Sequence, residues 1–177
     1  MTTNASVRWA EQRPEGERWE LLDGEPVAMA PERLGHARPK LRALQALQAA
    51  IVERGLACEA FINGVAVRVD DRSTYQPDAL VRCGEPLDDD TLLAVDPLIV
   101  VEVASPSTGK ADLTTKLEGY FRIPSLCHYL ILIAGRRSVI HHARGSTGRI
   151  TTSILQPPAE LGLDPSGLSV PVAALFA

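Results

Sequence analysis

The sequence predicts a single α+β or α/β domain built around a mixed β-sheet. Three observations lead to this prediction: a helical apolar pattern over residues 35–54, an almost unbroken aliphatic run at residues 98–103, and several shorter strand-like runs. The 177 residues fit one domain, and 45% hydrophobic with 23% charged residues is a globular composition. The expected order of elements is β-β-α-β-β-β-α-β-β-β.

The first part of the chain is expected to hold a loose tail, a hairpin and a long helix. Residues 1–8 have no apolar h-region and are expected to form a flexible tail. Asp23-Gly24 lies between two strand-like runs within residues 19–29, which predicts a β-hairpin. Over residues 35–54, leucine and alanine recur at steps of three and four, and Gly55 follows as a helix-ending glycine.

The remaining elements are predicted from apolar runs between turn residues. They are strands over 57–69, 78–83 and 98–103, a helix over 112–122, strands over 129–133, 138–143 and 150–155, and a closing turn over 172–176. Residues 157–171 are expected to be a loop. The run at 98–103 is the most apolar, so we expect a strand that is buried on both faces of the sheet.

Charge and cysteine content limit the class of protein. The formal net charge is −4 and the pI is near 5.6, so any basic surface for nucleic acid must be local. Three cysteines without metal-ligand spacing or a secretion signal predict buried free thiols in a reducing cytoplasm; they are Cys58, Cys83 and Cys127. No apolar run approaches the roughly 20 residues that span a bilayer, so no membrane partner is expected.

Glu102 is a carboxylate inside the most apolar run of the chain. Burying an unpaired carboxylate is costly, so it needs a partner or a metal ion. An edge-strand or solvent-facing position, or a structural ion pair, is the alternative interpretation.

Asp78 follows Pro77 and begins a second apolar run. Taken alone, a Pro-Asp pair is typical of the start of a strand. Together with Glu102 on a neighbouring strand, it forms a pair of oxygen ligands of the kind that Mg²⁺ prefers. Such an ion activates water and neutralises charge on a phosphate.

Asp112, Lys116 and Tyr120 follow one another in steps of four, which places them on one face of the predicted helix. The functional hypothesis has Lys116 pointing into the carboxylate site, where it would orient or help deprotonate the attacking water, or stabilise charge in the transition state. The alternative is a solvent-exposed Asp-Lys pair beside a packed tyrosine.

These segments, in this order and at this spacing, carry a resemblance to a known family. They are residues 77–81 (Pro-Asp-Ala-Leu-Val), residues 98–107 and the Asp112-Lys116-Tyr120 series, joined by residues 19–29 and by His36. The chain resembles the Uma2 family of restriction-endonuclease-like proteins, which belongs to the PD-(D/E)XK nuclease superfamily. The resemblance covers most of the chain and implies a restriction-endonuclease-like mixed sheet flanked by helices.

The resemblance also implies a role for each matching residue. Asp78 would be the Asp of the Pro-Asp signature and Glu102 the acid of the (D/E)XK signature. Both would bind the metal ion, and the main-chain carbonyl of Val103 would complete its coordination. The signature places a lysine two residues after the acid, where this chain has Ala104. Lys116 on the following helix is the candidate for that role.

Four further residues are candidates for the same site: Glu20, His36, Asp112 and Tyr120. Glu20 matches an early Glu-Leu-x-x-Gly segment of the family, although an ordinary exposed strand residue is the alternative. Residues 124–127 and 129–133 depart from the family pattern, which puts a local turn in doubt rather than the catalytic centre. His128, His141 and His142 are expected to be structural or surface residues, because adjacent histidines in a strand point to opposite faces.

The function expected from these residues is Mg²⁺- or Mn²⁺-dependent hydrolysis of phosphodiester bonds in nucleic acid, with DNA as the expected substrate. A catalytically inactive binding domain of the same fold and a hydrolase of small phosphate esters are the alternatives. The superfamily often forms dimers, so the resemblance implies a homodimer. Residues 1–177 would form one nuclease domain.

Overall fold

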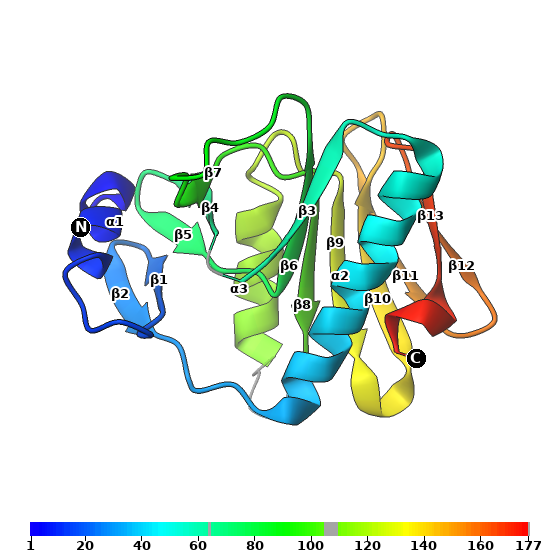
Figure 1. Cartoon of the computed structure of the whole chain (residues 1–177), viewed down its shortest axis with the longest axis horizontal. Helices are drawn as coiled ribbons and strands as arrows, with labels where there is room; N and C mark the ends of the chain where they lie inside the picture. The colour runs from blue at the N-terminus through cyan, green and yellow to red at the C-terminus, as the bar shows by residue number, and fades with distance from the viewer. Residues whose placement is uncertain (64, 105–109, 177) are drawn as a thin grey trace.

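The computed structural model describes residues 1–63, 65–104 and 110–176, apart from the side chains of residues 110–112. It is a mixed α+β structure whose centre is a six-stranded sheet (Figure 1). The strands lie in the order β11 (Ile150–Leu155), β10 (Ser138–Arg144), β9 (His128–Ile133), β8 (Ile99–Val103), β6 (Ala79–Cys83) and β3 (Cys58–Ile62). β8 and β9 run parallel and the other neighbours antiparallel, which confirms the predicted mixed sheet.

Helices cover the two faces of this sheet. α2 (Leu34–Arg54) packs on one face, where its Leu47 shares a core cluster with Val101 and Val103 of β8. α3 (Lys110–Tyr120) lies on the other face, where Tyr120 packs in a second cluster with Val100. Because side chains alternate along a strand, β8 supplies both clusters, as predicted for a strand buried on both faces.

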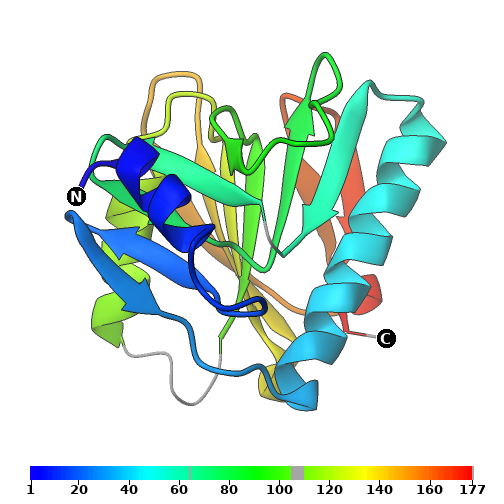
Figure 2. The ribbon, with the colours of Figure 1, turned by 60° about the vertical axis from the view of Figure 1, so that its left-hand side comes forward.

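A second sheet forms the N-terminal side of the molecule (Figure 2). Its strands lie in the order β2 (Glu25–Ala28), β1 (Trp19–Leu22), β5 (Ser73–Tyr75), β4 (Ala66–Asp70) and β7 (Leu93–Ala94). The predicted β1–β2 hairpin is confirmed. Asp23 and Gly24 have φ values of 49° and 87°, the left-handed conformation that a tight two-residue hairpin turn requires.

The loose tail expected over residues 1–8 is wrong, because this segment forms most of helix α1 (Thr3–Ala10). The helix is held by polar contacts to a distant part of the chain. Thr3 donates from its hydroxyl to the carbonyl of Asp70 at 2.7 Å and from its amide to the carbonyl of Asp71 at 2.8 Å. Such long-range anchors leave no periodic apolar pattern in a segment this short, so the sequence does not reveal them.

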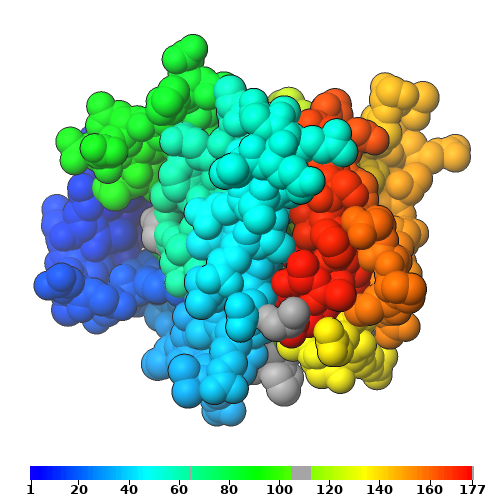
Figure 3. Space-filling model, turned by 45° about the vertical axis from the view of Figure 1, so that its right-hand side comes forward, coloured from blue at the N-terminus to red at the C-terminus, as the bar shows by residue number. Residues whose placement is uncertain are grey.

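The loop expected over residues 157–171 is also wrong. It contains a two-stranded sheet of β12 (Glu160–Leu163) and β13 (Leu168–Pro171). Alternate side chains of both strands, such as Leu161 and Val170, are fully buried in the cluster under α2. The closing turn is confirmed as a 3₁₀ helix, η2 (Val172–Leu175), and this C-terminal segment (red) lies beside α2 (cyan) in Figure 3.

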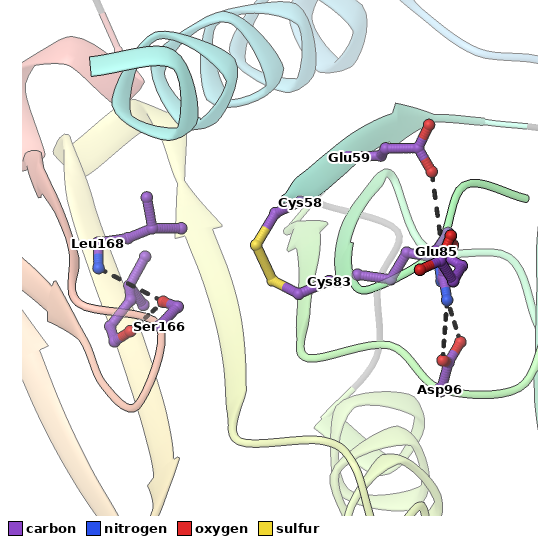
Figure 4. The surroundings of a disulfide bond; sticks show 9 residues. Cys58, Glu59, Cys83, Glu85, Asp96, Ser166 and Leu168 are labelled. Carbon is purple, nitrogen blue, oxygen red and sulfur yellow. Dashed lines mark hydrogen bonds and ion pairs between the residues drawn. A yellow bond between two sulfur atoms is a disulfide. The ribbon is translucent and has the colours of Figure 1, made fainter. Parts of the chain in front are cut away.

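The expectation of three free thiols is wrong as well, because Cys58 and Cys83 form a disulfide (Figure 4). The two residues are direct register partners on β3 and β6, a pairing that depends on tertiary structure. Cys127 is the free cysteine. Next to the disulfide, the guanidinium of Arg82 pairs with Asp96 at 3.0 Å.

The histidines expected to be structural are buried and bonded to one another or to neighbours. His128 and His141 share a 2.9 Å hydrogen bond between Nδ1 and Nε2, and burial lowers the pKa of His141 to about 4. His142 points to the opposite face, where it stacks on Tyr129. Among the described residues, no helix has the length and apolarity needed to cross a membrane.

Candidate carboxylate–lysine centre

Glu102 lies in the middle of the sheet, between β6 and β9, and its side chain faces α3. The Glu102 Oε1 atom accepts two hydrogen bonds from that helix, from Nζ of Lys116 at 3.0 Å and from the hydroxyl of Tyr120 at 2.8 Å. Lys116 and Tyr120 therefore share one helical face, as their spacing predicts. Glu102 is neither at an edge nor open to solvent: 12% of its side chain is exposed, and it has an ion-pair partner.

Glu20 on β1 belongs to the same group of side chains. Its Oε1 accepts from Lys116 Nζ at 3.0 Å and from the amide of Gln76 at 2.9 Å. The ammonium of Lys116 thus bridges two carboxylates from different sheets, and the exposed-strand interpretation of Glu20 is wrong because Glu20 is buried. This contact joins the N-terminal sheet to the central one.

Asp78 lies directly before β6, at the strand end that adjoins the C-terminal end of β8. Its Oδ2 accepts from the amide of Val103 at 2.7 Å, and its own amide donates to the carbonyl of Val101 at 3.0 Å. Its Oδ1 lies 2.8 Å from Nε2 of His36, in the first turns of α2. The structure therefore brings Asp78, Glu102, Lys116, Tyr120, Glu20 and His36 to one region between the two helices.

Three residues next to Asp78 were missed by sequence reasoning: Glu32, Lys40 and Asn63. Lys40 is buried, hydrogen-bonds Glu32, donates to Asn63 Oδ1 at 3.0 Å, and has its Nζ 4.0 Å from Asp78 Oδ1. One signal was available, because Lys40 follows His36 by four residues and so lies on the same helical face. Glu32 and Asn63 come from segments between elements, where no periodicity points to them.

Burial and charge shift the ionisation of this centre. Burial, with smaller contributions from the nearby carboxylates of Asp78 and Glu20, raises the pKa of Glu102 to about 7, against the lowering effects of Lys116 and of the hydrogen bond from Tyr120. Burial acts to lower the pKa of Lys116, but the carboxylates of Glu102 and Glu20 outweigh it and the net shift is upward. The hydrogen bond to the carboxylate of Asp78 raises the pKa of His36. Lys116 is thus an ammonium ion at neutral pH.

The donor set suits a hard divalent cation. One ligand atom each from Glu32, His36 and Asp78 lies within 4.8 Å of the others, and oxygen ligands at 2.0–2.6 Å from an ion can be about that far apart. The charge of Asp78 also raises the pKa of Glu102, so the two carboxylates repel each other. A cation there would relieve the repulsion between them.

Two expectations are not decided by this geometry. The side chain of Asp112 lies outside the described residues, so its place on the face of Lys116 and Tyr120 stays a prediction. The amide of Val103 binds Asp78, whereas the role expected for its carbonyl as a metal ligand stays a prediction. Ala104 is half-buried against the hydrophobic cluster that contains Tyr120 and Val100, on the same face of the chain as Glu102.

The fold and the centre together define a class: an α+β protein with a mixed sheet that carries acidic residues at the adjoining ends of two central strands and is contacted there by a lysine from a helix. The chain belongs to the Uma2 family, described as "Putative restriction endonuclease", which matches residues 5–173. This confirms the resemblance and the restriction-endonuclease-like fold.

A solved structure supports the same fold. It is a protein of Anabaena variabilis ATCC 29413, described as a putative nuclease belonging to DUF820. It has a TM-score of 0.75 and 13% sequence identity, over 96% of each chain. A search among curated proteins finds no match.

Proposed function

We propose that this protein is a divalent-metal-dependent nuclease that hydrolyses phosphodiester bonds of nucleic acid, with DNA as its substrate. The observation that carries the proposal is the convergence of Asp78 and Glu102 on adjacent strand ends, with the ammonium of Lys116 3.0 Å from Glu102. This arrangement can hold a cation and present a positive charge to a phosphate. Membership of the Uma2 family supports the choice of nucleic acid.

Asp78 and Glu102 would hold Mg²⁺ or Mn²⁺, with the carbonyl of Val103 as a further ligand. His36 lies against Oδ1 of Asp78, so it would either join the coordination or fix the orientation of that carboxylate. Held by these residues, such an ion would supply polarisation of the phosphate and a lowered pKa for water.

Lys116 would act as a charged donor rather than as a base. Its pKa lies above the ordinary lysine value, so it keeps its proton at neutral pH. Held by Glu102 and Glu20, the ammonium can orient an attacking water by hydrogen bonding and stabilise negative charge on the phosphate. Tyr120 would fix the rotamer of Glu102 through its 2.8 Å hydrogen bond.

The test is cleavage of labelled single- and double-stranded DNA with Mg²⁺ or Mn²⁺, and with EDTA. Asp78→Asn and Glu102→Gln should abolish cleavage, because each removes a carboxylate charge without changing the side-chain shape. Glu118→Gln is the matched control, since Glu118 is an exposed carboxylate on the same helix as Lys116. Cleavage that survives both site variants, or that persists in EDTA, would overturn the proposal.

Metal binding without cleavage would instead favour an inactive binding domain. Titration calorimetry with Mn²⁺ distinguishes this case, because binding should disappear in Asp78→Asn whether or not DNA is cut. Turnover of a small phosphate diester without DNA cleavage would favour the small-ester hydrolase.

We also propose that the protein is a homodimer and works in the cytoplasm. The dimer rests on the superfamily resemblance, and a monomeric mass in light scattering would contradict it. Because stable disulfides are typical of oxidising compartments, the redox state of Cys58 and Cys83 in whole cells is the measurement that checks the location.

A further inference from the structure

Strand β11 is the outer strand at one end of the central sheet, and in the part of the chain that the structure describes it pairs with β10 alone. In Figure 1 it lies on the side of the molecule away from the N-terminal sheet. Its sequence, Ile-Thr-Thr-Ser-Ile-Leu, has no charge and no proline, and its register with β10 is continuous. The first five of these residues are exposed. A regular, uncharged edge of this kind is a template for pairing with another strand.

The other three edges of the two larger sheets are protected in ways that β11 is not. β2 carries Glu25 and Pro26, and β7 has only two residues. β3 carries Glu59 and packs beside α2. Charges, prolines, short strands and covering helices are the usual means by which an edge avoids pairing with another chain. Among these four described edges, β11 is the one that has none of these features.

The direction of the backbone groups along β11 follows from the turn that joins it to β10. Gly145 donates its amide to the carbonyl of Arg149 at 2.8 Å, so these two residues form a hydrogen-bonded pair at the turn. Because bonded and non-bonded pairs alternate along an antiparallel ladder, the next pair, Arg144 and Ile150, is non-bonded. The amide of Arg144 accordingly donates to the carbonyl of Cys127, on the side of β9, at 2.8 Å.

Alternate residues of β11 therefore direct their backbone N–H and C=O groups away from β10; they are Ile150, Thr152 and Ile154. Among the described residues, these outward groups have no backbone partner. The side chains of the same three residues lie on one face of the strand, where Ile150 is 42% and Ile154 is 71% exposed. The edge thus presents unpaired backbone groups and two exposed isoleucines that flank a threonine.

A second copy of β11 fits this edge when the two strands run antiparallel about a two-fold axis at Thr152. Thr152 then lies opposite Thr152 of the second copy, and each Ile150 lies opposite Ile154 of the second copy. Each of these pairs joins outward-directed groups and can exchange two hydrogen bonds. A register shifted by one residue would instead set outward-directed groups against groups that are bonded to β10. The pairing also buries the exposed isoleucines against each other and sets no like charges opposite one another.

We propose that β11 is the interface of a homodimer in which two central sheets join edge to edge about a two-fold axis at Thr152. The inference rests on the proposed homodimer and adds its interface. A two-fold dimer requires a self-complementary patch, which is what β11 offers. Glu102 lies three strands away, on β8, so the interface leaves the carboxylate–lysine centre of each copy uncovered.

The first test is cross-linking through position 152 under mild oxidation. Thr152→Cys should give a disulfide-linked dimer, because Cα atoms of a hydrogen-bonded antiparallel pair are about 5.5 Å apart, within disulfide reach. Thr151→Cys is the matched control, since Thr151 would lie roughly 8 Å from its own copy, beyond that reach. Each variant loses one hydrogen bond to β10, with His142 or with Ala143, and both carry Cys127→Ser to remove the native free thiol. Equal cross-linking of the two variants, or none, would overturn the inference.

The second test is the dimer dissociation constant from analytical ultracentrifugation. Ile154→Lys should raise the Kd about tenfold or more, because the two-fold axis removes the apolar contact twice. Val52→Lys is the control, since Val52 is 79% exposed but lies on α2. Adding Ile150→Glu to Ile154→Lys should recover part of the affinity, because the new carboxylate of one copy then faces the new ammonium of the other. Equal Kd values for Ile154→Lys and Val52→Lys, or no recovery, would overturn the inference.

The outcome is separable from that of the other proposals. A dimer that persists unchanged in Ile154→Lys keeps the homodimer and overturns its interface. A wild type that is monomeric at all concentrations overturns both. DNA cleavage is measured independently, so a dimer that is cross-linked through Thr152→Cys and cuts nothing supports the interface while the nuclease proposal fails.

Discussion

Glu102 on β8 and Lys116 on α3 meet at 3.0 Å although 14 residues separate them in the chain. The lysine of the (D/E)XK signature would stand two residues after the acid, where this chain has Ala104. Both positions are on the side of the sheet that faces α3. Lys116 on the helix therefore places its ammonium beside the same carboxylate that a lysine at position 104 of the strand would contact.

Returning the lysine to the strand should therefore restore part of the activity. Lys116→Ala should reduce cleavage about 10²- to 10³-fold, the usual effect of removing one stabilising donor. Adding Ala104→Lys to that variant should recover at least tenfold, because the new side chain starts from the same face. DNA cleavage rates of the single and double variants measure this. A double variant no more active than Lys116→Ala would show that the two positions are not equivalent.

Stability should fall with rising pH because of Glu102. Its pKa is about 7 in the folded protein against an ordinary value of 4.5, so the folded state binds the extra proton between these values. Because the pKa is raised in the folded state, protonated Glu102 contributes to the free energy of unfolding below pH 4.5. This contribution is lost as the pH rises to about 7. The loss is on the order of 3 kcal/mol.

Urea unfolding of the wild type and of Glu102→Gln from pH 4.5 to 8 measures this effect. The difference between the two proteins removes the opposite contribution of His128, His141 and His142, whose pKa values are lowered by burial. A difference that does not change with pH would contradict the assignment.

His36→Ala should weaken Mn²⁺ binding about 10- to 100-fold, the usual effect of removing a metal-linked histidine contact. The reason is the 2.8 Å contact between His36 Nε2 and Asp78 Oδ1, which orients the carboxylate. Titration calorimetry with Mn²⁺ at pH 8 is the measurement. Asp89→Asn, in an exposed acidic loop, serves as the control. Unchanged affinity in His36→Ala would exclude His36 from the metal site.

Reduction of the Cys58–Cys83 disulfide should lower the free energy of unfolding by about 3 kcal/mol, the loop-closure effect expected for a cross-link over 25 residues. Guanidinium unfolding with and without reductant gives the difference. Thiol titration of the denatured, unreduced protein should find one thiol, Cys127, and titration after reduction should find three. Three thiols without reductant would show that the pair is reduced in solution.

Much of the fold follows from local patterns. The helix over residues 35–54, the β1–β2 hairpin and the doubly buried strand at residues 98–103 each have a periodicity or turn signal within their own residues. The prediction failed where long-range contacts decide the structure. Helix α1 depends on Thr3 bonding the chain near Asp70, and the β12–β13 pair depends on burial under α2.

The residues of the candidate site also fall into two groups: those predicted from local motifs and those brought together only by packing. Asp78, Glu102, Lys116 and Tyr120 were predicted from motif order, because their residue types and spacing lie within short segments. Glu32, Lys40 and Asn63 come from three separate parts of the chain, and only the packing of α2 against the sheet brings Lys40 4.0 Å from Asp78.

The sequence by itself determined which side chains carry the chemistry and which faces of each element are buried, since both are local properties of residue type and period. Only the tertiary structure decided that Lys116 bridges Glu102 and Glu20 and that Cys58 faces Cys83. The physical reason is that such contacts depend on how whole elements pack, and no local pattern encodes the distance between them.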